Sequence, residues 1–132
     1  MTAVRCETIT NNDYPVAVHV RAHELRADMG VASGGTDSGP GAHDFLDIAL
    51  ATCKAHTVMW YAKRKGVPLE RVRVVVESDA TKEREGLYKM RVTLTFDGPL
   101  SDEQRTMLQR AAAACPITKL LTTSEVEIET AT

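Results

Sequence analysis

The sequence lacks any run of about eighteen uncharged apolar residues, the length that a membrane-spanning helix needs. Its first ten residues, MTAVRCETIT, contain no apolar core of a secretory signal. Lysine and arginine are scattered, the formal net charge is −2, and the longest basic run is Lys63-Arg64-Lys65. Neither nucleic acid nor an anionic membrane is therefore expected as a partner. Together these absences predict a cytoplasmic protein.

Cysteine is also scarce, with three residues in the chain of 132. An odd count argues against a disulfide framework, and cytoplasmic cysteines are usually reduced, reactive or simply buried. Hydrophobic residues make up 43% of the chain, which is enough for a core. The length suits a single domain spanning residues 1–132, and neither an internal repeat nor an interdomain linker is visible.

The stretch from Gly39 to Gly66 organises the rest of the chain. Its sequence, GPGAHDFLDIALATCKAHTVMWYAKRKG, predicts a helix from Ala42 to Lys65, with Gly41 as N-cap and Gly66 just after the last turn. Asp44, at the third helical position, can accept backbone N–H groups and complements the positive end of the helix dipole. Because the helix is apolar on nearly all sides, we expect it to be buried in a core or an interface.

Alternating apolar and polar residues predict strands over residues 3–10, 16–21, 23–28, 70–78 and 87–97, and a last strand near Val126 and Ile128. In the third of these, Leu25 and Ala27 are expected to point inward and Asp28 outward. Residues 30–41 form a glycine-rich loop, either a flexible approach to a site or a plain connector.

A second helix is expected to begin at Ser101, because Ser101 and Gln104 have capping-box spacing, and to stop at Pro116. Cys115 would then lie in its last turn, and residues 117–121 would add a short helical turn. The order of elements predicts an α+β fold in which one antiparallel sheet carries both helices on one face.

Two cysteines carry the case for chemistry, although by spacing alone each also fits a small packed hydrophobic residue. Cys53 lies in the middle of the long helix, and Cys115 lies beside a proline. A peroxide-reducing enzyme needs one thiolate that attacks the O–O bond and becomes a sulfenic acid, and a second thiol that condenses with it to a disulfide. Because an apolar setting raises a thiol's pKa, a cation, usually an arginine, must oppose that effect.

Other candidates are weaker. Cys53-x-x-His56 could place two metal ligands on one helix face, but no zinc-like spacing recurs, so no metal or cofactor is expected. His56 is instead expected to be a hydrogen-bonded core histidine, and Trp60 a core or interface residue. His43 and Asp47 have the spacing of a surface pair, and Cys6 has no partner motif.

Several of these residues resemble the motifs of one family. Gly34-Gly35, Gly39-Pro40, His43-Asp44-Phe45-Leu46 and Ala49-Leu50-Ala51-Thr52-Cys53 are similar to the GG…GP…HDLL…ALGAC pattern of OsmC/Ohr-like proteins, and Cys115-Pro116-Ile117 is similar to the family's Cys-Pro-Val motif. These names denote osmotically inducible protein C and the organic hydroperoxide resistance protein. The stretch from Tyr61 to Glu70 also resembles the segment after the family's first helix. The resemblance covers residues 23 to 129.

The resemblance implies an intertwined homodimer with its long helices at the centre and its sites at the subunit interface. It also implies thiol-based reduction of organic hydroperoxides, with a lipoyl-type dithiol as reductant. Cys53 would be the attacking thiol and Cys115 the resolving thiol. An apolar surround from Phe45, Leu46, Met59 and Trp60 would favour organic peroxides over hydrogen peroxide.

The sequence departs from the best-known branch of the family at two positions. His43 stands where that branch has a glutamate, with the acid Asp44 after it, and Asn11-Asn12-Asp13 replaces a Gly-Gly-Arg turn. These departures indicate the broader OsmC-like branch. Asp44 or His43 would then orient another arginine, Arg21 or else Arg26, toward Cys53, although both arginines also fit solvated positions on a strand face. The alternative function is a non-catalytic dimer that binds a small apolar ligand or a thiol metabolite.

Overall fold

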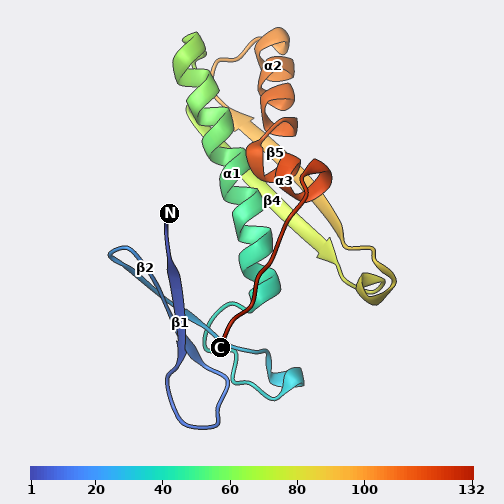
Figure 1. Cartoon of the computed structure of the whole chain (residues 1–132). Helices are drawn as coiled ribbons and strands as arrows, with labels where there is room; N and C mark the ends of the chain where they lie inside the picture. Colours follow the sequence, from blue (N-terminus) through green and yellow to red (C-terminus); the bar gives the residue numbers. More distant parts are fainter. The chain divides into compact units, whose positions relative to one another are not determined.

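The computed structural model describes all 132 residues. Its regular elements are β1 (Val4–Thr8), β2 (Val16–Val20), β3 (His23–Ala27), α1 (Ala42–Lys65), β4 (Arg71–Asp79), β5 (Lys89–Asp97), α2 (Asp102–Ala113) and α3 (Pro116–Thr123) (Figure 1). Two short 3-10 turns, η1 (Val31–Ser33) and η2 (Glu83–Glu85), lie in loops. The fold is mixed α+β with antiparallel pairing, as expected. The expectation of one sheet was wrong. The strands form two separate sheets, β1-β2-β3 and β4-β5, and no backbone hydrogen-bond ladder joins them.

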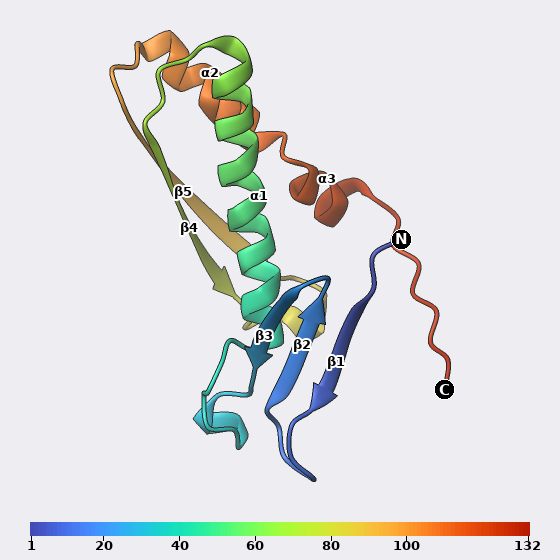
Figure 2. The same ribbon diagram turned by 90° about the vertical axis from the view of Figure 1, so that its left-hand side faces the viewer.

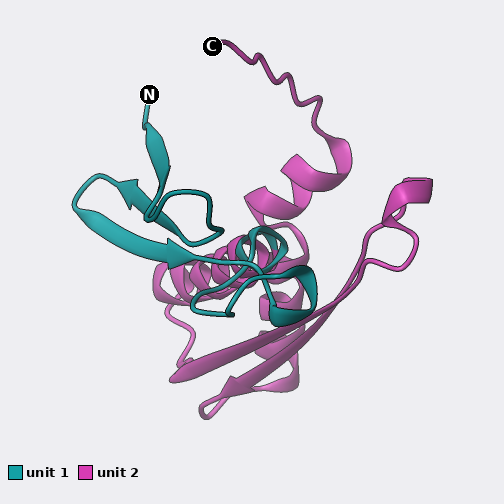
Figure 3. Ribbon diagram, turned by 90° about the horizontal axis from the view of Figure 1, so that it is seen from below, with its two compact units in different colours: residues 1–46 teal, residues 47–132 magenta.

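The chain divides into two compact units, residues 1–46 and residues 47–132 (Figure 3). The first unit contains the three-stranded sheet, in which β2 pairs with β1 on one side and β3 on the other. Its buried residues are only Pro15 and Asp28. Leu25, expected to point inward, is 46% exposed, so the three-stranded sheet has no apolar core of its own.

Asp28 is the organising residue of the loop that follows β3. The expectation that it would point outward was wrong, because the residue is buried. Its carboxylate accepts hydrogen bonds from the backbone N–H of Met29, and from the N–H and hydroxyl groups of both Thr36 and Ser38, at 2.7–3.3 Å. The Ser38 N–H, followed by the Ser38 and Thr36 hydroxyls, holds the pKa of Asp28 well below its usual range, against the opposing effect of burial. The loop is therefore tied around one carboxylate.

Two glycines of the family-like motifs allow that loop to pack closely. A Cβ atom at Gly35 would lie 2.0 Å from the Met29 carbonyl oxygen, and one at Gly39 would lie 2.5 Å from that of Arg26. No side chain can occupy either position without moving the backbone.

Both ends of α1 follow the sequence. The Gly41 N–H donates to Asp44 Oδ2 at 2.8 Å, so Asp44 is the acid of the first turn, as expected. Lys63, Arg64 and Lys65 occupy the last turn. Gly66 then takes a left-handed conformation with φ of 66°, and the Val67 N–H donates to the Ala62 carbonyl, which confirms the predicted end.

The second unit has the apolar core. Val72, Val74 and Val76 of β4 lie opposite Phe96, Leu94 and Val92 of β5, and this face of the hairpin is the one that the alternation predicts. The buried cluster on it combines residues of α1, β5 and α2, namely Val58, Ala62, Phe96, Leu108 and Ala112. The two helices therefore pack together over one face of the hairpin (Figure 2).

Two polar contacts fix elements of the second unit. Asp47, which the sequence offers as a surface partner for His43, accepts hydrogen bonds from the Ser78 hydroxyl at 2.6 Å and the Tyr88 hydroxyl at 2.8 Å. At the start of α2, Ser101 and Gln104 make both bonds of the predicted capping box. The first contact ties α1 to the hairpin, and the second defines where α2 begins.

The two faces of α1 in this unit differ. Positions four residues apart form a buried row of Leu50, Lys54, Val58 and Ala62, and the opposite row, Ile48, Thr52, His56 and Trp60, is exposed. Trp60 is 60% exposed, with the Arg64 guanidinium 4.9 Å from its ring centroid. Trp60 is therefore not a core residue, and the expectation of a core role for His56 was also wrong.

The C-terminal part also differs from expectation. Residues 116–123 form a full helix, α3, instead of a short turn. Residues 124–132 have no regular structure, with Val126 61% and Ile128 86% exposed, so the predicted last strand was wrong. A strand requires a neighbour for its backbone N–H and C=O groups, and residues 124–132 pair with no strand in this chain.

Candidate functional site

Cys53 lies on α1 next to the buried row, and it is half-buried as a free thiol. Its sulfur lies 4.0 Å from the hydroxyl oxygen of Thr57, one turn further along the helix. Because α1 packs in the core through its neighbouring positions, the helix holds this thiol at the edge of the core. An intermediate exposure leaves it the more accessible of the two thiols.

Cys115 lies between α2 and α3. The expectation that it would lie in the last turn of α2 was wrong. It is the N-cap residue of α3, with Pro116 at the first helical position, where a missing N–H and a fixed φ cost nothing. Cys115 is a free thiol that is 0% exposed. Its sulfur lies 2.9 Å from the hydroxyl oxygen of Thr118, in the first turn of α3.

Lys54 brings a buried cation to the same place. Its side chain is 7% exposed, and its ammonium donates hydrogen bonds to the Ala112 carbonyl at 2.8 Å and to the Thr118 hydroxyl at 3.0 Å. Both partners of the ammonium are neutral oxygens, and no carboxylate pairs with it. A buried charge without a counter-charge is costly, so an anion nearby would be stabilised.

The Cys115 sulfur is the group that can carry that anion. Burial would raise the pKa of Cys115, but the Thr118 hydroxyl and N–H, the Lys54 charge and the Cys53 thiol together lower it below its ordinary value. A hydrogen-bond donor or a nearby cation favours a thiolate in this way. The Cys53 thiol is thus a neighbour of the Cys115 sulfur, and the electrostatic support in this site is directed to Cys115.

The structure therefore brings Cys53 and Cys115 together in the second unit. The other predicted site residues, Arg21, His43 and Asp44, belong to the first unit, and a role for them beside the thiols stays a prediction. Arg21 is an exposed residue with φ of 51° that follows β2, so it is a turn residue and not a strand-face charge. Arg26, the alternative, donates to the Ser38 hydroxyl at 2.9 Å.

Sequence reasoning missed Lys54 and Thr118, although both had detectable signals. Lys54 occupies the position between Leu50 and Val58 in a row spaced by four residues, where an apolar side chain would complete the stripe. A lysine in such a place signals a buried cation with a specific partner. Thr118 lies three residues after Cys115, the spacing at which an N-cap side chain meets the first turn of its helix.

The other candidates acquire no such surroundings. His56 is exposed, and no group of three or more His, Cys, Asp and Glu side chains is placed to hold a metal ion. Cys6 is a free, exposed thiol on β1. None of the helices combines the length and apolar character needed to span a bilayer.

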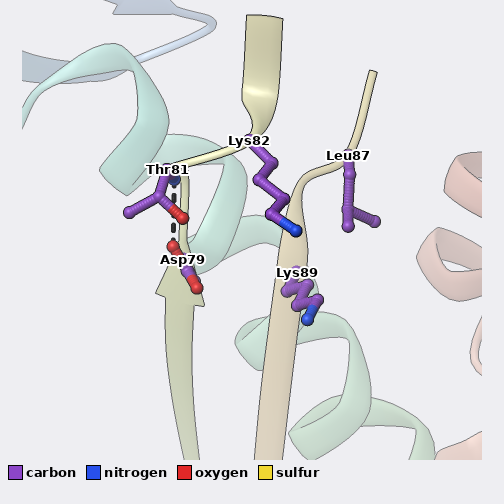
Figure 4. Close-up of a pocket in the computed structure, with 5 residues that line it drawn as sticks. All are labelled: Asp79, Thr81, Lys82, Leu87 and Lys89. Carbon is purple, nitrogen blue, oxygen red and sulfur yellow. Dashed lines mark hydrogen bonds between the residues drawn. The ribbon is translucent and has the colours of Figure 1, made fainter. Parts of the chain in front are cut away.

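A separate hollow lies at the far end of the β4–β5 hairpin. It is lined by Asp79, Thr81, Lys82, Leu87 and Lys89 (Figure 4). The Asp79 carboxylate accepts the Thr81 N–H at 2.9 Å, and both lysine side chains lie at the surface. Because this hollow contains no thiol and little apolar wall, we assign the chemistry to the cysteine site.

Several solved structures share this fold. Over 93% of the chain, the fold matches 88% of an OsmC-like protein from Mycoplasma pneumoniae, with a TM-score of 0.74 at 16% identity. It matches 90% of the organic hydroperoxide resistance protein OsmC from Legionella pneumophila (93% of this chain, TM-score 0.66, 19% identity). It also matches 91% of the organic hydroperoxide resistance protein OhrB from Bacillus subtilis (93% of this chain, TM-score 0.62, 18% identity).

At such identities the structural matches show the fold alone. A search of curated proteins finds no match. The family model described as OsmC-like protein matches residues 35–131, a range that includes the second half of the glycine-rich loop, both site cysteines and the hairpin. The chain therefore belongs to the OsmC-like protein family.

Proposed function

We propose that the protein reduces organic hydroperoxides, with Cys53 as the attacking thiol and Cys115 as the resolving thiol. The observation that carries the proposal is the pairing of two free thiols in unlike settings: Cys53 is half-buried, and Cys115 is enclosed beside Lys54 and Thr118. A peroxide can approach the first thiol more readily than the second. The names of the Legionella and Bacillus proteins also favour an organic hydroperoxide as substrate.

The first chemical step needs a thiolate at Cys53. The Cys115 sulfur, which its donors favour as a thiolate despite burial, is a base beside the Cys53 thiol and can take up its proton as the Cys53 sulfur attacks. The Cys53 sulfur then attacks the terminal oxygen of the hydroperoxide, so that an S–O bond forms and the O–O bond breaks. The leaving alkoxide takes the proton back from Cys115 and departs as an alcohol, and Cys53 becomes a sulfenic acid.

The second step joins the two cysteines. The Cys115 thiolate attacks the Cys53 sulfur, an S–S bond forms, the S–O bond breaks, and hydroxide leaves and is protonated to water. The two cysteine thiols have then supplied two electrons, and the products are one alcohol and one water. A dithiol, of lipoyl type in our proposal, reduces the disulfide and completes the cycle.

The proposal includes a homodimer in the cytoplasm, where cysteines are kept reduced between turnovers. The exposed row of α1 favours a partner, because Ile48 is 46% and Trp60 60% exposed. The three-stranded sheet, which buries only Pro15 and Asp28 in its unit, favours one for the same reason. A second copy of the chain can cover both surfaces.

A second candidate function is binding without turnover. It is favoured by one observation about the two thiols. The cation of the site, Lys54, donates to Thr118 beside Cys115, whereas the sulfur of Cys53, the thiol that would attack the peroxide, contacts the Thr57 hydroxyl at 4.0 Å. A thiol metabolite or a small apolar ligand could occupy the same site without being oxidised or reduced.

An assay with an alkyl hydroperoxide and dihydrolipoamide separates the two functions. We expect the wild-type protein and the control Cys6→Ser to consume peroxide, because Cys6 is exposed on β1, outside the site, and Cys53→Ser to be inactive. Peroxide consumption that is the same with and without Cys53 would overturn the proposed function. A wild-type protein that stays reduced in excess hydroperoxide would leave binding as the function.

A further inference from the structure

The buried side chain of Lys54 has a role that the two-thiol mechanism does not use. Its ammonium donates to Thr118 Oγ1 at 3.0 Å, and Thr118 Oγ1 lies 2.9 Å from the Cys115 sulfur. A lysine ammonium can only donate hydrogen bonds, so the Thr118 oxygen accepts from Lys54 and its own hydrogen is available to the sulfur. The three groups therefore form a relay that ends at Cys115 and favours a negative charge there.

Few other groups surround the Lys54 ammonium and the Cys115 sulfur. Lys54 also donates to the Ala112 carbonyl at 2.8 Å, which anchors the ammonium at the end of α2. The titratable group that α1 adds next to the sulfur is Cys53, and α3 contributes only the Thr118 hydroxyl and N–H. A thiolate at Cys115 is thus the anion that can balance the buried charge of Lys54.

We propose that Lys54 is a positioning residue that makes Cys115 the leaving thiolate when the Cys53–Cys115 disulfide is reduced, so that the incoming thiol attacks Cys53. This inference rests on the proposed function, since it concerns the reduction of the disulfide that peroxide forms. In thiol–disulfide exchange, the sulfur with the lower pKa leaves faster. Exposure also favours attack at Cys53, because Cys53 is half-buried whereas Cys115 is 0% exposed.

The disulfide is reduced in two successive thiol–disulfide exchanges. One thiolate of the reductant attacks the Cys53 sulfur, a mixed disulfide forms, and the bond to Cys115 breaks with its electron pair on the Cys115 sulfur, beside the Thr118 hydroxyl. The second thiol of the reductant, after losing its proton, then attacks the reductant's own sulfur in the mixed disulfide. Cys53 is released as a thiolate that takes up a proton, and the reductant leaves as a disulfide.

The first test measures the charge on Cys115 without any peroxide. In a Cys6→Ala/Cys53→Ser background only Cys115 can ionise as a thiol, and its ultraviolet thiolate absorbance is followed against pH. We expect Lys54→Met to shift the titration midpoint to higher pH and Lys54→Arg to restore it in large part. Thr118→Val should shift it in the same direction, and Thr118→Ser should not. A midpoint that is unchanged in both Lys54→Met and Thr118→Val would overturn the proposal.

The second test locates the attack. The disulfide is made with diamide, a general thiol oxidant, and then reacted with 2-mercaptoethanol, quenched in acid and mapped by peptide analysis. We expect the mixed disulfide at Cys53, and reduction that is several-fold slower in Lys54→Met than in Lys54→Arg. An adduct at Cys115 in the wild-type protein would overturn the proposal.

Because diamide and not a peroxide forms the bond, both results are independent of whether peroxides are substrates. A protein that shows the expected midpoints and adduct but consumes no hydroperoxide would retain the role of Lys54 and lose the proposed function. Failure of diamide to join Cys53 and Cys115 would overturn both.

Discussion

The Thr118 hydroxyl oxygen lies 2.9 Å from the Cys115 sulfur and 3.0 Å from the Lys54 ammonium. This one hydroxyl connects a cation on α1 with a thiol at the start of α3. It explains why a fully buried cysteine can have a pKa below the ordinary value of a thiol. Burial raises the pKa of Cys115, whereas Thr118, Lys54 and Cys53 lower it, and the lowering prevails. The site therefore favours a thiolate inside the core.

Burial raises the pKa of Cys115, but Thr118, Lys54 and Cys53 lower it by more. This lowered pKa predicts how the free energy of unfolding changes with pH. Between the folded pKa and the ordinary thiol value of about 8.5, the unfolded chain binds more protons than the folded chain. The free energy of unfolding should therefore gain a contribution as pH rises through this window, keep it above the window, and lose it as pH falls through the folded pKa.

Urea unfolding of wild type and Cys115→Ala at a series of pH values tests this effect. The difference in unfolding free energy between the two proteins should grow with pH up to about 8.5 and then level off. Cys6→Ala, which changes an exposed thiol, is the matched control and should follow wild type. A constant difference between wild type and Cys115→Ala would contradict the prediction.

Peroxide should join Cys53 and Cys115 in a disulfide, because the Cys53 thiol is one of the groups next to the Cys115 sulfur. A disulfide requires the two Cα atoms to lie within about 7 Å, which a helix end such as Cys115 can reach by a small shift. Peptide mapping after one equivalent of alkyl hydroperoxide should find this pair and leave Cys6 reduced.

The two cysteine variants should then differ in kind. Cys115→Ser should consume one equivalent of peroxide and stop with Cys53 as a sulfenic or over-oxidised acid, whereas Cys53→Ser should consume none. A sulfenic acid at Cys115 in the Cys53→Ser variant would reverse the two roles. A disulfide that includes Cys6 would contradict the pairing.

Much of the second unit, and the start of α1, follow from the sequence. The alternation of Val72, Val74 and Val76 with charged residues fixes which face of β4 packs, and the structure pairs them with the matching residues of β5. The glycine and acid at the ends of α1 and the capping box at Ser101 also define helix ends correctly. These features are local, so a single sequence contains the information for them.

Features that depend on contacts distant in sequence were not predictable in the same way. Lys54 meets Ala112 and Thr118, which lie 58 and 64 residues away, and Asp28 gathers groups up to ten residues ahead of it. Local patterning assigns such polar residues to the surface by default. The last strand failed for a related reason, since alternation at Val126 and Ile128 cannot say whether a neighbouring strand exists.

Asp44 and His43 should separate a structural role from a catalytic one. Asp44 accepts the Gly41 N–H at an exposed helix start, so Asp44→Ala should cost about 0.3–1 kcal/mol of unfolding free energy. If that is its whole role, peroxide consumption should be unaffected, and Asp44→Asn should recover part of the loss in stability. If Asp44 or His43 orients an arginine, activity of the corresponding alanine variant should fall without a matching loss of stability. Thermal unfolding and peroxide assays on the same preparations decide between the two.

A homodimer should form through the exposed row of α1, in which Ile48 and Trp60 are 46% and 60% exposed. Rows of side chains spaced by four residues are the ridges through which helices pack against each other, and large exposed apolar residues on one helix face favour such packing. Sedimentation at micromolar concentration should give twice the chain mass of 14.4 kDa. Trp60→Glu should shift the protein toward monomer, because a carboxylate would be buried in the interface, whereas Leu87→Glu at the tip of the hairpin, where the native side chain is 41% exposed, should not. A wild-type monomer at this concentration, or equal dimerisation by both variants, would show that the exposed row of α1 is not the interface.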